Sequence, residues 1–261
     1  MTRFERRNSE RAEIPRENAR VLITDGERFG VIDDRLATTP FDANDDALYL
    51  GRLEGAPLFL ALGIEIECDM LDFRAAAAAL GSDDIALLSY AKGMLNWQSR
   101  ARFCGACGAA LESRNGGHSR VCPSCDLEVF PRIDPAVMML ATHDDRILLA
   151  QHRGRATAFW STLAGFVEHG ESLEEAARRE LREETGLAAR DIRYFGSQPW
   201  PLPASLMIGF TMIVESPELS IDETELIDAR WFARDELEAL NLSGKISLSR
   251  WMIEAWRHHL T

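Results

Sequence analysis

The stretch GFVEHGESLEEAARRELREETGL, residues 165–187, decides the fold of the C-terminal half of the chain. Ser172 and Glu175 have the three-residue spacing of a capping box, in which each side chain accepts a hydrogen bond from the backbone of the other residue. Gly186 can adopt the left-handed conformation that ends a helix. We therefore predict a helix over residues 173–185 with both ends fixed.

The faces of this helix follow from the rotation of 100° per residue. Its apolar stripe consists of Leu173, Ala176, Ala177 and Leu181. Glu180 and Glu184 fall within the stripe and Glu183 lies at its edge, so we expect three carboxylates to face inward. An ordinary surface helix rich in glutamate would carry its acids opposite the leucines, and the residue order contradicts that alternative.

Three inward carboxylates need a physical reason. Two like charges about 5 Å apart repel by roughly 3 kcal/mol at an effective dielectric constant near 20. Protonation could relieve this repulsion, but a cluster of carboxylate oxygens is also what Mg²⁺ or Mn²⁺ prefers. Arg179, one turn before Glu183, is expected to pair with it.

Around this helix the sequence predicts strands and one stiff loop. Residues 136–142 and 147–150 are expected to form a hairpin, and residues 159–167 another strand that leads into the helix. Pro199, Pro201 and Pro203 lack backbone donors, so their segment is predicted to be a stiff loop rather than a central strand. Near the end of the chain, Trp251, Ala255 and Trp256 form a stripe typical of a helix core.

A second strong motif precedes this region. Two C-x-x-C pairs, separated by fourteen residues, are made by Cys104, Cys107, Cys122 and Cys125. Four thiolates at this spacing favour a structural zinc ion held on a hairpin. The surrounding segment 98–132 has five Arg against three acids, which permits contact with nucleic acid, although a solvated face is the commoner reason for such a balance.

The first 99 residues show no catalytic spacing. Short apolar runs at 48–50 and 58–62 predict strands, and residues 74–80 and 83–102 predict helices because alanine and leucine dominate them without proline. The unpaired Cys68 is expected to be a small buried hydrophobic residue.

Composition narrows the class of protein. The 261 residues are 46% hydrophobic and 27% charged, and 29 Lys and Arg against 42 Asp and Glu give a net charge of −13. This balance is typical of a globular protein and disfavours general coating of nucleic acid. No apolar run is long enough to span a membrane and the N-terminus has no apolar signal region, so we expect a soluble, cytoplasmic protein without a membrane partner.

Residues 165–187 resemble the Nudix box at every specified position of that motif, G-x5-E-x7-R-E-hydrophobic-x-E-E-x-G-hydrophobic. The downstream segment SQPWPLPAS, residues 197–205, is similar to the signature of the NADH pyrophosphatase family, with Leu202 in place of the usual Phe. The resemblance covers about residues 90–235. It implies an α/β/α sandwich with a mixed sheet in 132–261, a zinc ribbon in 100–131 and a small α+β domain in 1–99, so the fold class is α+β or α/β.

The resemblance also implies the roles of individual residues. The catalytic and metal-binding set would be Glu180, Glu183, Glu184 and, from a later loop, Glu225. The substrate contacts would be Phe166, Gln198, Ser205 and Phe130, the last lent by the partner subunit of a homodimer and standing where the family usually has Tyr. Glu183 or Glu184 is expected to position or deprotonate the attacking water.

The implied activity is metal-dependent hydrolysis of the pyrophosphate bond of NADH and, less readily, NAD⁺, giving AMP and nicotinamide mononucleotide. Removal of NAD caps from RNA 5′ ends is implied as well. Alternatives are a broader Nudix hydrolase acting on ADP-ribose or dinucleoside polyphosphates, and a zinc-ribbon RNA-binding module with a vestigial site. The complete glutamate set argues against the vestigial site.

Overall fold

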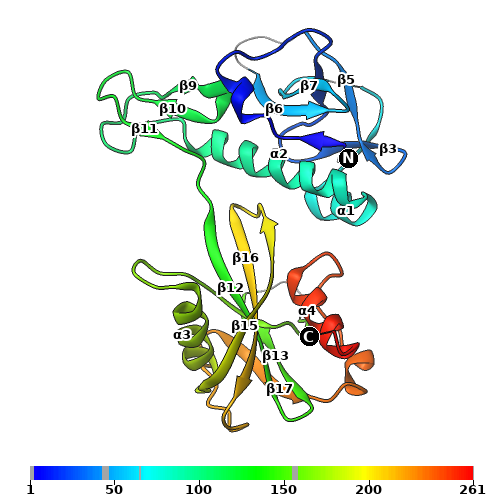
Figure 1. Ribbon diagram of the computed structural model, residues 1–261, viewed down its shortest axis with the longest axis vertical. Coiled ribbons are helices and arrows are strands. Elements are labelled where there is room, and N and C mark those ends of the chain that lie inside the picture. The colour runs from blue at the N-terminus through cyan, green and yellow to red at the C-terminus, as the bar shows by residue number, and fades with distance from the viewer. Residues whose placement is uncertain (1–2, 43–46, 65, 155–157, 261) are drawn as a thin grey trace. The chain divides into compact units, whose positions relative to one another are not determined.

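The computed structural model describes residues 3–42, 47–64, 66–154 and 158–260 (Figure 1). The chain forms two compact units. The first comprises Met1–Arg132 together with Pro201–Ala204, and the second comprises Ile133–Trp200 and Ser205–Thr261. The first unit therefore contains both the predicted N-terminal domain and the predicted ribbon. Their separate boundaries stay a prediction.

The first unit begins with two small sheets and two helices. A five-stranded sheet has the order β1 (Phe4–Glu5), β6 (Leu48–Leu53), β7 (Ala56–Leu60), β2 (Arg20–Leu22) and β5 (Thr38–Pro40). A three-stranded sheet has the order β4 (Arg35–Leu36), β3 (Phe29–Ile32) and β8 (Asp69–Leu71). Helices α1 (Phe73–Ala79) and α2 (Ser82–Arg100) follow, close to the predicted bounds, and the Asp72 side chain caps α1. Cys68 is only partly buried, which corrects the expectation of a buried residue.

The ribbon segment is a small antiparallel sheet, with one cysteine turn before its first strand and the other between its last two strands. It has the order β11 (Glu128–Val129), β10 (Ser119–Val121) and β9 (Glu112–Arg114). Each turn closes with a backbone hydrogen bond from the residue after its second cysteine to the first cysteine, Gly108 to Cys104 (2.9 Å) and Asp126 to Cys122 (2.9 Å). The two turns therefore present their thiols in the same local geometry.

The second unit is built on one mixed sheet. Its strand order is β15 (Ala189–Trp200), β16 (Ser205–Val214), β12 (Asp134–His143), β13 (Arg146–His152) and β17 (Leu226–Phe232), with β14 (Leu163–Phe166) paired to β12. The pairing of β12 with β16 is parallel and the others are antiparallel. The predicted hairpin is confirmed: β12 and β13 are joined by a two-residue turn in which Asp144 has a positive φ of 50°.

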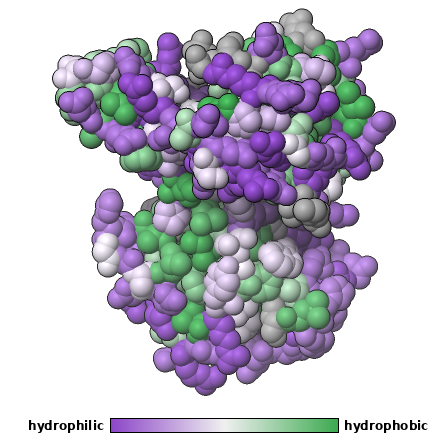
Figure 2. Space-filling view, turned by 45° about the horizontal axis from the view of Figure 1, so that its top comes forward, coloured by the Kyte–Doolittle hydropathy of each residue, from purple (hydrophilic) through white to green (hydrophobic). Residues whose placement is uncertain are grey.

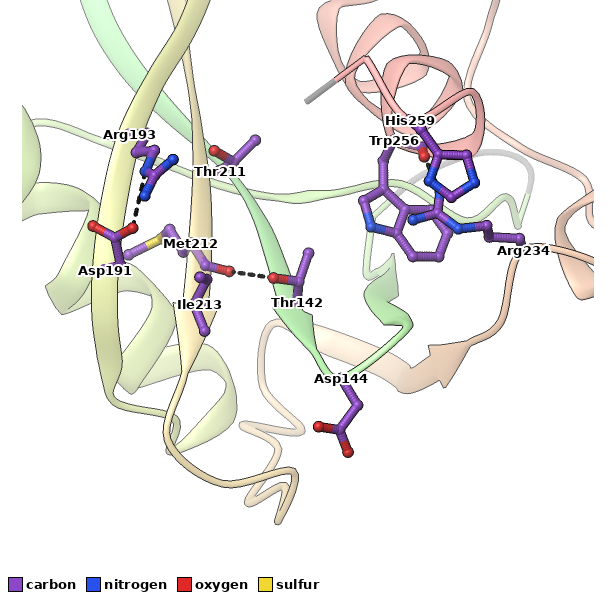
Figure 3. Close-up of a pocket in the computed structure, with 10 residues that line it drawn as sticks. All are labelled: Thr142, Asp144, Asp191, Arg193, Thr211, Met212, Ile213, Arg234, Trp256 and His259. Atoms are coloured by element: carbon purple, nitrogen blue, oxygen red, sulfur yellow. Dashed lines mark hydrogen bonds and ion pairs between the residues drawn. The ribbon is translucent and has the colours of Figure 1, made fainter.

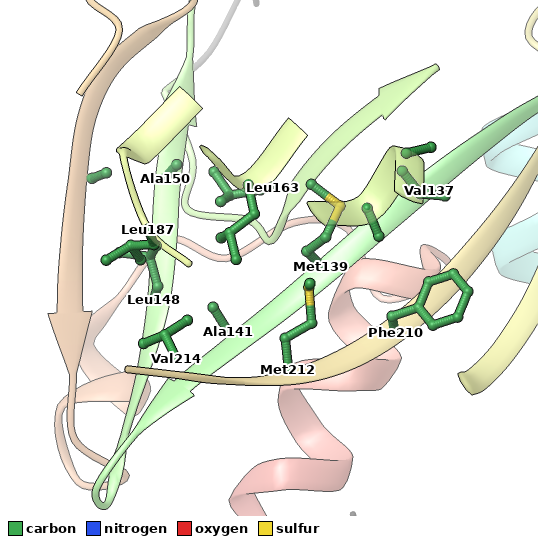
Figure 4. Packing of buried hydrophobic residues seen from close by; sticks show 14 of the residues in the cluster. Val137, Met139, Ala141, Leu148, Ala150, Leu163, Leu187, Phe210, Met212 and Val214 are labelled. Atoms are coloured by element: carbon green, nitrogen blue, oxygen red, sulfur yellow. The ribbon is translucent and has the colours of Figure 1, made fainter. Parts of the chain in front are cut away.

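Two helices cover the two faces of this sheet. Helix α3 (Leu173–Thr185) lies on one face and α4 (Leu248–Arg257) on the other (Figure 1). Strand β12 supplies both cores by alternation. Val137, Met139 and Ala141 pack in the core on the α3 side (Figure 4), whereas Met138 and Leu140 pack in the core on the α4 side. The predicted α/β/α sandwich is therefore confirmed.

Three local predictions differ from the structure. The strand predicted over 159–167 is confined to Leu163–Phe166, because the backbone of Trp160 is bonded to the loop at Asn241 and Ser243. Pro201 and Pro203 lie in the turn between β15 and β16, as predicted, but residues 197–200 end β15. This strand is not central, also as predicted: it lies at the edge of the sheet and therefore tolerates Pro199. Trp251 is 55% exposed, whereas Ala255 and Trp256 are buried as predicted.

Among the described residues, no helix combines the length and the apolar character needed to cross a membrane.

Candidate active site and metal centres

Helix α3 presents the catalytic candidates, and its ends are fixed as predicted. The Ser172 hydroxyl accepts a hydrogen bond from the Glu175 backbone (3.2 Å) and the Glu175 carboxylate accepts one from the Ser172 backbone (2.8 Å). Gly186 ends the helix with a φ of 73°. The rotation of the helix about its axis, and thus the direction of each glutamate, is set by the burial of its apolar stripe.

Glu180 lies directly against the backbone of β14. A Cβ atom built on Gly165 would stand 1.8 Å from Glu180 Cδ and 2.1 Å from Glu180 Oε1, so only glycine leaves room for this carboxylate. Burial raises the pKa of Glu180, and the nearby charges of Glu183 and Glu225 act in the same direction, while Arg179 opposes them. Glu225, the predicted fourth ligand, is therefore close enough for its charge to raise the pKa of Glu180.

Arg179 organises the site. Its guanidinium donates to both carboxylate oxygens of Glu171 (2.6 and 2.9 Å), to Glu180 Oε1 (2.8 Å), to Glu183 Oε2 (3.0 Å) and to the backbone oxygen of Phe166 (2.9 Å). The predicted Arg179–Glu183 pair is confirmed. The hydrogen bonds of Arg179 also lower the pKa of Glu171 to about 2. The Arg179 guanidinium thus fixes the positions of three carboxylates and of the end of β14 that carries Phe166.

The three helix glutamates differ in exposure. Glu184 is 2% exposed and the Glu180 side chain 12%, but the Glu183 side chain is 59% exposed. The expectation that all three face inward is therefore wrong for Glu183. It stands at the edge of the apolar stripe, where solvent and the Arg179 guanidinium are both within reach.

The carboxylate set has the chemistry of ligands for hard divalent cations. Glu180 is held on a glycine cradle, Glu183 is open to solvent, and Glu225 comes from the turn before β17. Carboxylate oxygens are the ligands that Mg²⁺ and Mn²⁺ take, and a bound cation would offset the burial of the Glu180 charge and its repulsion by Glu183 and Glu225, which raise the pKa of Glu180. Among the described residues, only the four cysteines bring three or more possible ligand atoms within 4.8 Å of one another.

The predicted substrate contacts are placed differently from one another. Phe166 and Phe130 expose 59% and 62% of their surface, so both rings are open to a ligand. Ser205 begins β16, opposite Trp200. The Gln198 side chain is already engaged, because it donates to the Ile246 carbonyl (2.7 Å) and accepts from the Leu248 backbone (2.7 Å) at the start of α4.

The four cysteines converge into one cluster. Their sulfur atoms all lie within 4.8 Å of one another, with Cys104 Sγ 3.7 Å from Cys125 Sγ and Cys107 Sγ 3.4 Å from Cys122 Sγ. Zn–S bonds of about 2.3 Å in a tetrahedron place the sulfurs roughly 3.8 Å apart, so the cluster fits zinc. Backbone N–H groups of Ala106 and Cys107 lower the pKa of Cys104 to about 7, which favours its thiolate. The pKa of Cys125 is raised, because the contacts with the other sulfurs outweigh the hydrogen bond from the Leu127 backbone.

A separate cavity of about 240 Å³ lies at the Thr142 end of β12 (Figure 3). Its charged lining is paired: Arg193 bonds Asp191 at 2.9 Å, and Arg234 bonds Asp145 and lies over the Trp256 ring. In the glutamate cluster, by contrast, one arginine faces several acids.

The surfaces of the two units differ in polarity. Hydrophobic residues gather on part of the visible face of the second unit, while polar residues cover most of the visible face of the first unit (Figure 2).

Known proteins share both the motifs and the fold. Residues 132–252 match the family model of the NUDIX domain, and residues 99–130 match that of the NADH pyrophosphatase zinc ribbon domain. The NAD-capped RNA hydrolase NudC of Mycobacterium tuberculosis is 39% identical over 262 residues, which cover 91% of this chain and 82% of that protein. The chain belongs to the NudC family of Nudix hydrolases. The NudC of Stutzerimonas stutzeri is 37% identical over 79% of this chain and 76% of its own length.

The fold of this Nudix hydrolase also matches a solved structure. A crystal structure of a NUDIX hydrolase from Nitrosomonas europaea aligns with a TM-score of 0.53 over 60% of this chain and 93% of that one. At 21% identity this likeness supports the fold alone.

Two features of the site escape prediction from sequence. The pairing of Glu171 with Arg179 spans eight positions and depends on the path of the loop before α3, so helical spacing does not reveal it. The contact between Gly165 and Glu180 joins a strand to a helix, and the sequence signals it only by the glycine itself.

Proposed function

We propose that this Nudix hydrolase cleaves the pyrophosphate bond of NADH and NAD⁺ and removes NAD caps from RNA 5′ ends. The observation that carries the proposal is the carboxylate cluster of α3, ordered by Arg179, in a chain that aligns over 91% of its length with an NAD-capped RNA hydrolase. Water adds across one P–O–P bridge. The products are AMP and reduced or oxidised nicotinamide mononucleotide from the free dinucleotide, or nicotinamide mononucleotide and 5′-monophosphate RNA from a capped transcript, with release of a proton.

Glu180, Glu183, Glu184 and Glu225 would hold the divalent ions, Mg²⁺ or Mn²⁺. Once bound, these ions supply charge neutralisation at the pyrophosphate oxygens. The protein itself supplies order: Arg179 fixes the carboxylates of Glu180 and Glu183 before substrate arrives, which lowers the reorganisation needed in the transition state. The cysteine cluster would hold structural Zn²⁺.

We assign the attacking water to Glu183 rather than Glu184. Glu183 is open to solvent, and Arg179 bonds only its Oε2 atom, so Oε1 can accept a proton or orient a water. Glu184 is buried at 2% exposure, where a water from bulk solvent has no ready access.

The exposed rings of Phe166 and Phe130 are proposed to stack on the bases of the substrate, with Phe130 lent by the partner subunit of a homodimer. Ser205 and Gln198 would add polar contacts. The Gln198 side chain already bonds the start of α4. Gln198 would therefore contact substrate either through its backbone or after its side-chain amide has left these hydrogen bonds.

Replacement of the water-holding carboxylate tests the mechanism. We expect Glu183→Gln to reduce NADH hydrolysis to background while the unfolding temperature stays within a few degrees of wild type, because the side chain is exposed. Glu174→Gln, on the same helix and also exposed, is the matched control and should keep wild-type turnover. Wild-type turnover by Glu183→Gln would refute the assignment.

The substrate is tested by mass spectrometry of the products. NADH, NAD⁺, NAD-capped RNA, ADP-ribose and diadenosine polyphosphates are incubated in parallel, each with Mg²⁺ or Mn²⁺. We expect nicotinamide mononucleotide from the NAD-containing substrates. A preference for ADP-ribose over all of them would contradict the proposal.

A further inference from the structure

Glu225 sits on a short turn rather than on a helix or strand. The turn begins at Asp222, whose backbone N–H donates to the Glu184 carbonyl at the end of α3 (3.0 Å). The Asp222 carboxylate accepts from the Thr224 backbone (2.8 Å) and hydroxyl (2.7 Å), and the Leu226 backbone donates to the Asp222 carbonyl (3.0 Å). These bonds close the turn but tie it to the rest of the unit only on the α3 side.

Arg153 supplies the tie on the other side. Its backbone N–H donates to the Glu225 carbonyl (2.8 Å), which continues the pairing of β13 with β17 by one residue. Its side chain then reaches back, and Nε donates to the Glu223 carbonyl (2.5 Å). Two bonds from one residue thus hold the turn at Glu223 and at Glu225 itself.

The hydrogen bond to Glu223 is the one side-chain interaction of Arg153 among the described residues. Within the part of the chain that the structure describes, this side chain forms no ion pair, and it is exposed and outside the apolar cores. Its hydrogen bond goes to a backbone carbonyl two residues before Glu225, so its effect is on the path of the turn rather than on a neighbouring charge.

We propose that Arg153 is a positioning residue that holds the Glu225 turn in the geometry needed for divalent-cation binding. This inference rests on the proposed function, in which Glu225 is one of the metal ligands. Ligand side chains must be held to within about half an ångström to bind a cation well. Without the Arg153 side chain the turn keeps the backbone bond at Glu225 but loses the bond at Glu223, and with it the control of the path that leads into Glu225. Arg153 acts through Glu225 and is not itself expected to touch substrate.

The test measures metal binding directly as well as activity. Unbound Mn²⁺ is followed by electron paramagnetic resonance with the full-length protein and no substrate, and the Mn²⁺ concentration for half-maximal NADH hydrolysis is measured in parallel. We expect Arg153→Ala to weaken Mn²⁺ binding about 10-fold, with an unfolding temperature near that of wild type. Arg153→Lys retains a donor of similar reach and should restore most of the affinity.

Two further variants separate this role from a general effect of charge. Arg178→Ala removes a partly exposed guanidinium that also bonds a backbone carbonyl, that of Glu174 on α3, and should leave Mn²⁺ binding unchanged. When Arg153→Ala is made in a Glu225→Gln protein, it should weaken Mn²⁺ binding by less than about a further 2-fold, because both changes act on the same ligand.

The outcomes distinguish the two proposals. Wild-type Mn²⁺ binding by Arg153→Ala beside weakened binding by Glu225→Gln would overturn the role of Arg153 alone, as would full additivity of the two changes or a failure of Arg153→Lys to recover affinity. Unchanged binding by Glu225→Gln would overturn both the metal set and the role of Arg153.

Discussion

At the scale of single residues, the site depends on a glycine that is not needed for its backbone conformation. Gly165 has no positive φ, so its role is steric: any side chain at this position would occupy the space of the Glu180 carboxylate. The obstructed atoms are the far end of a flexible side chain, which can swing away. The fold should therefore tolerate a methyl group that the site does not.

We predict that Gly165→Ala loses about 100-fold in NADH hydrolysis, since displacing a catalytic group by about 1 Å has an effect of that order. Its unfolding temperature should stay close to that of wild type. Gly244→Ala is the control in the same unit, because a Cβ there meets nothing within 4 Å, and it should keep full activity. Equal activity of the two variants would mean that Glu180 does not need its observed place.

The residue-level predictions from sequence succeed where spacing along one helix decides the geometry. The Arg179–Glu183 pair is found as expected. The inward direction assigned to Glu183 fails, because a helical projection gives an angle but not the depth of the neighbouring surface. The role of Arg153 is invisible in the sequence, since its side chain bonds a carbonyl 70 positions away.

At the scale of elements, α3 is predicted to the residue because both of its end signals are local. Strand β15 is not, because whether Pro199 can belong to a strand depends on whether that strand lies at a sheet edge, which is decided by partners elsewhere in the chain. Similarly, Trp251 has the periodicity of a core residue, yet its ring lies over Gly196 of this edge strand and stays half exposed.

The junction between α2 and the ribbon carries a prediction of its own. His118, next to the turn before β10, is 7% exposed and its Nε2 atom lies 2.5 Å from the Tyr90 hydroxyl on α2. Burial, aided by the charge of Arg11, lowers the pKa of His118 to about 4. Between pH 6.5 and pH 4 the unfolded chain therefore binds a proton that the folded chain does not, and stability falls as the pH falls.

We expect the first unit to lose about 2 kcal/mol of unfolding free energy between pH 7 and pH 5 through His118. His118→Gln removes the titrating group and should flatten this part of the pH dependence, whatever its effect on stability at pH 7. The measurement is chemical unfolding at several pH values. An equal slope in both proteins would show that His118 is accessible to protons in the folded state.

At the scale of the whole molecule, charge limits how RNA can be held. The net charge of −13 repels a polyphosphate chain at long range, while the segment 98–132 carries five Arg against three acids. Binding of a capped transcript beyond its NAD end must therefore come from local contacts between the protein and the RNA phosphates. Such contacts release counterions, and the free dinucleotide, which has no following phosphates, does not share them.

The salt dependence of turnover then measures how many RNA phosphates the protein contacts. If the protein holds about three phosphates of the RNA, kcat/KM on NAD-capped RNA should fall roughly 20-fold between 50 and 200 mM salt, from a slope of about −0.7 per phosphate. Hydrolysis of free NADH, measured in the same buffers, should change much less. Parallel curves for the two substrates would mean that only the cap is bound, and that the arginines of segment 98–132 are a solvated surface.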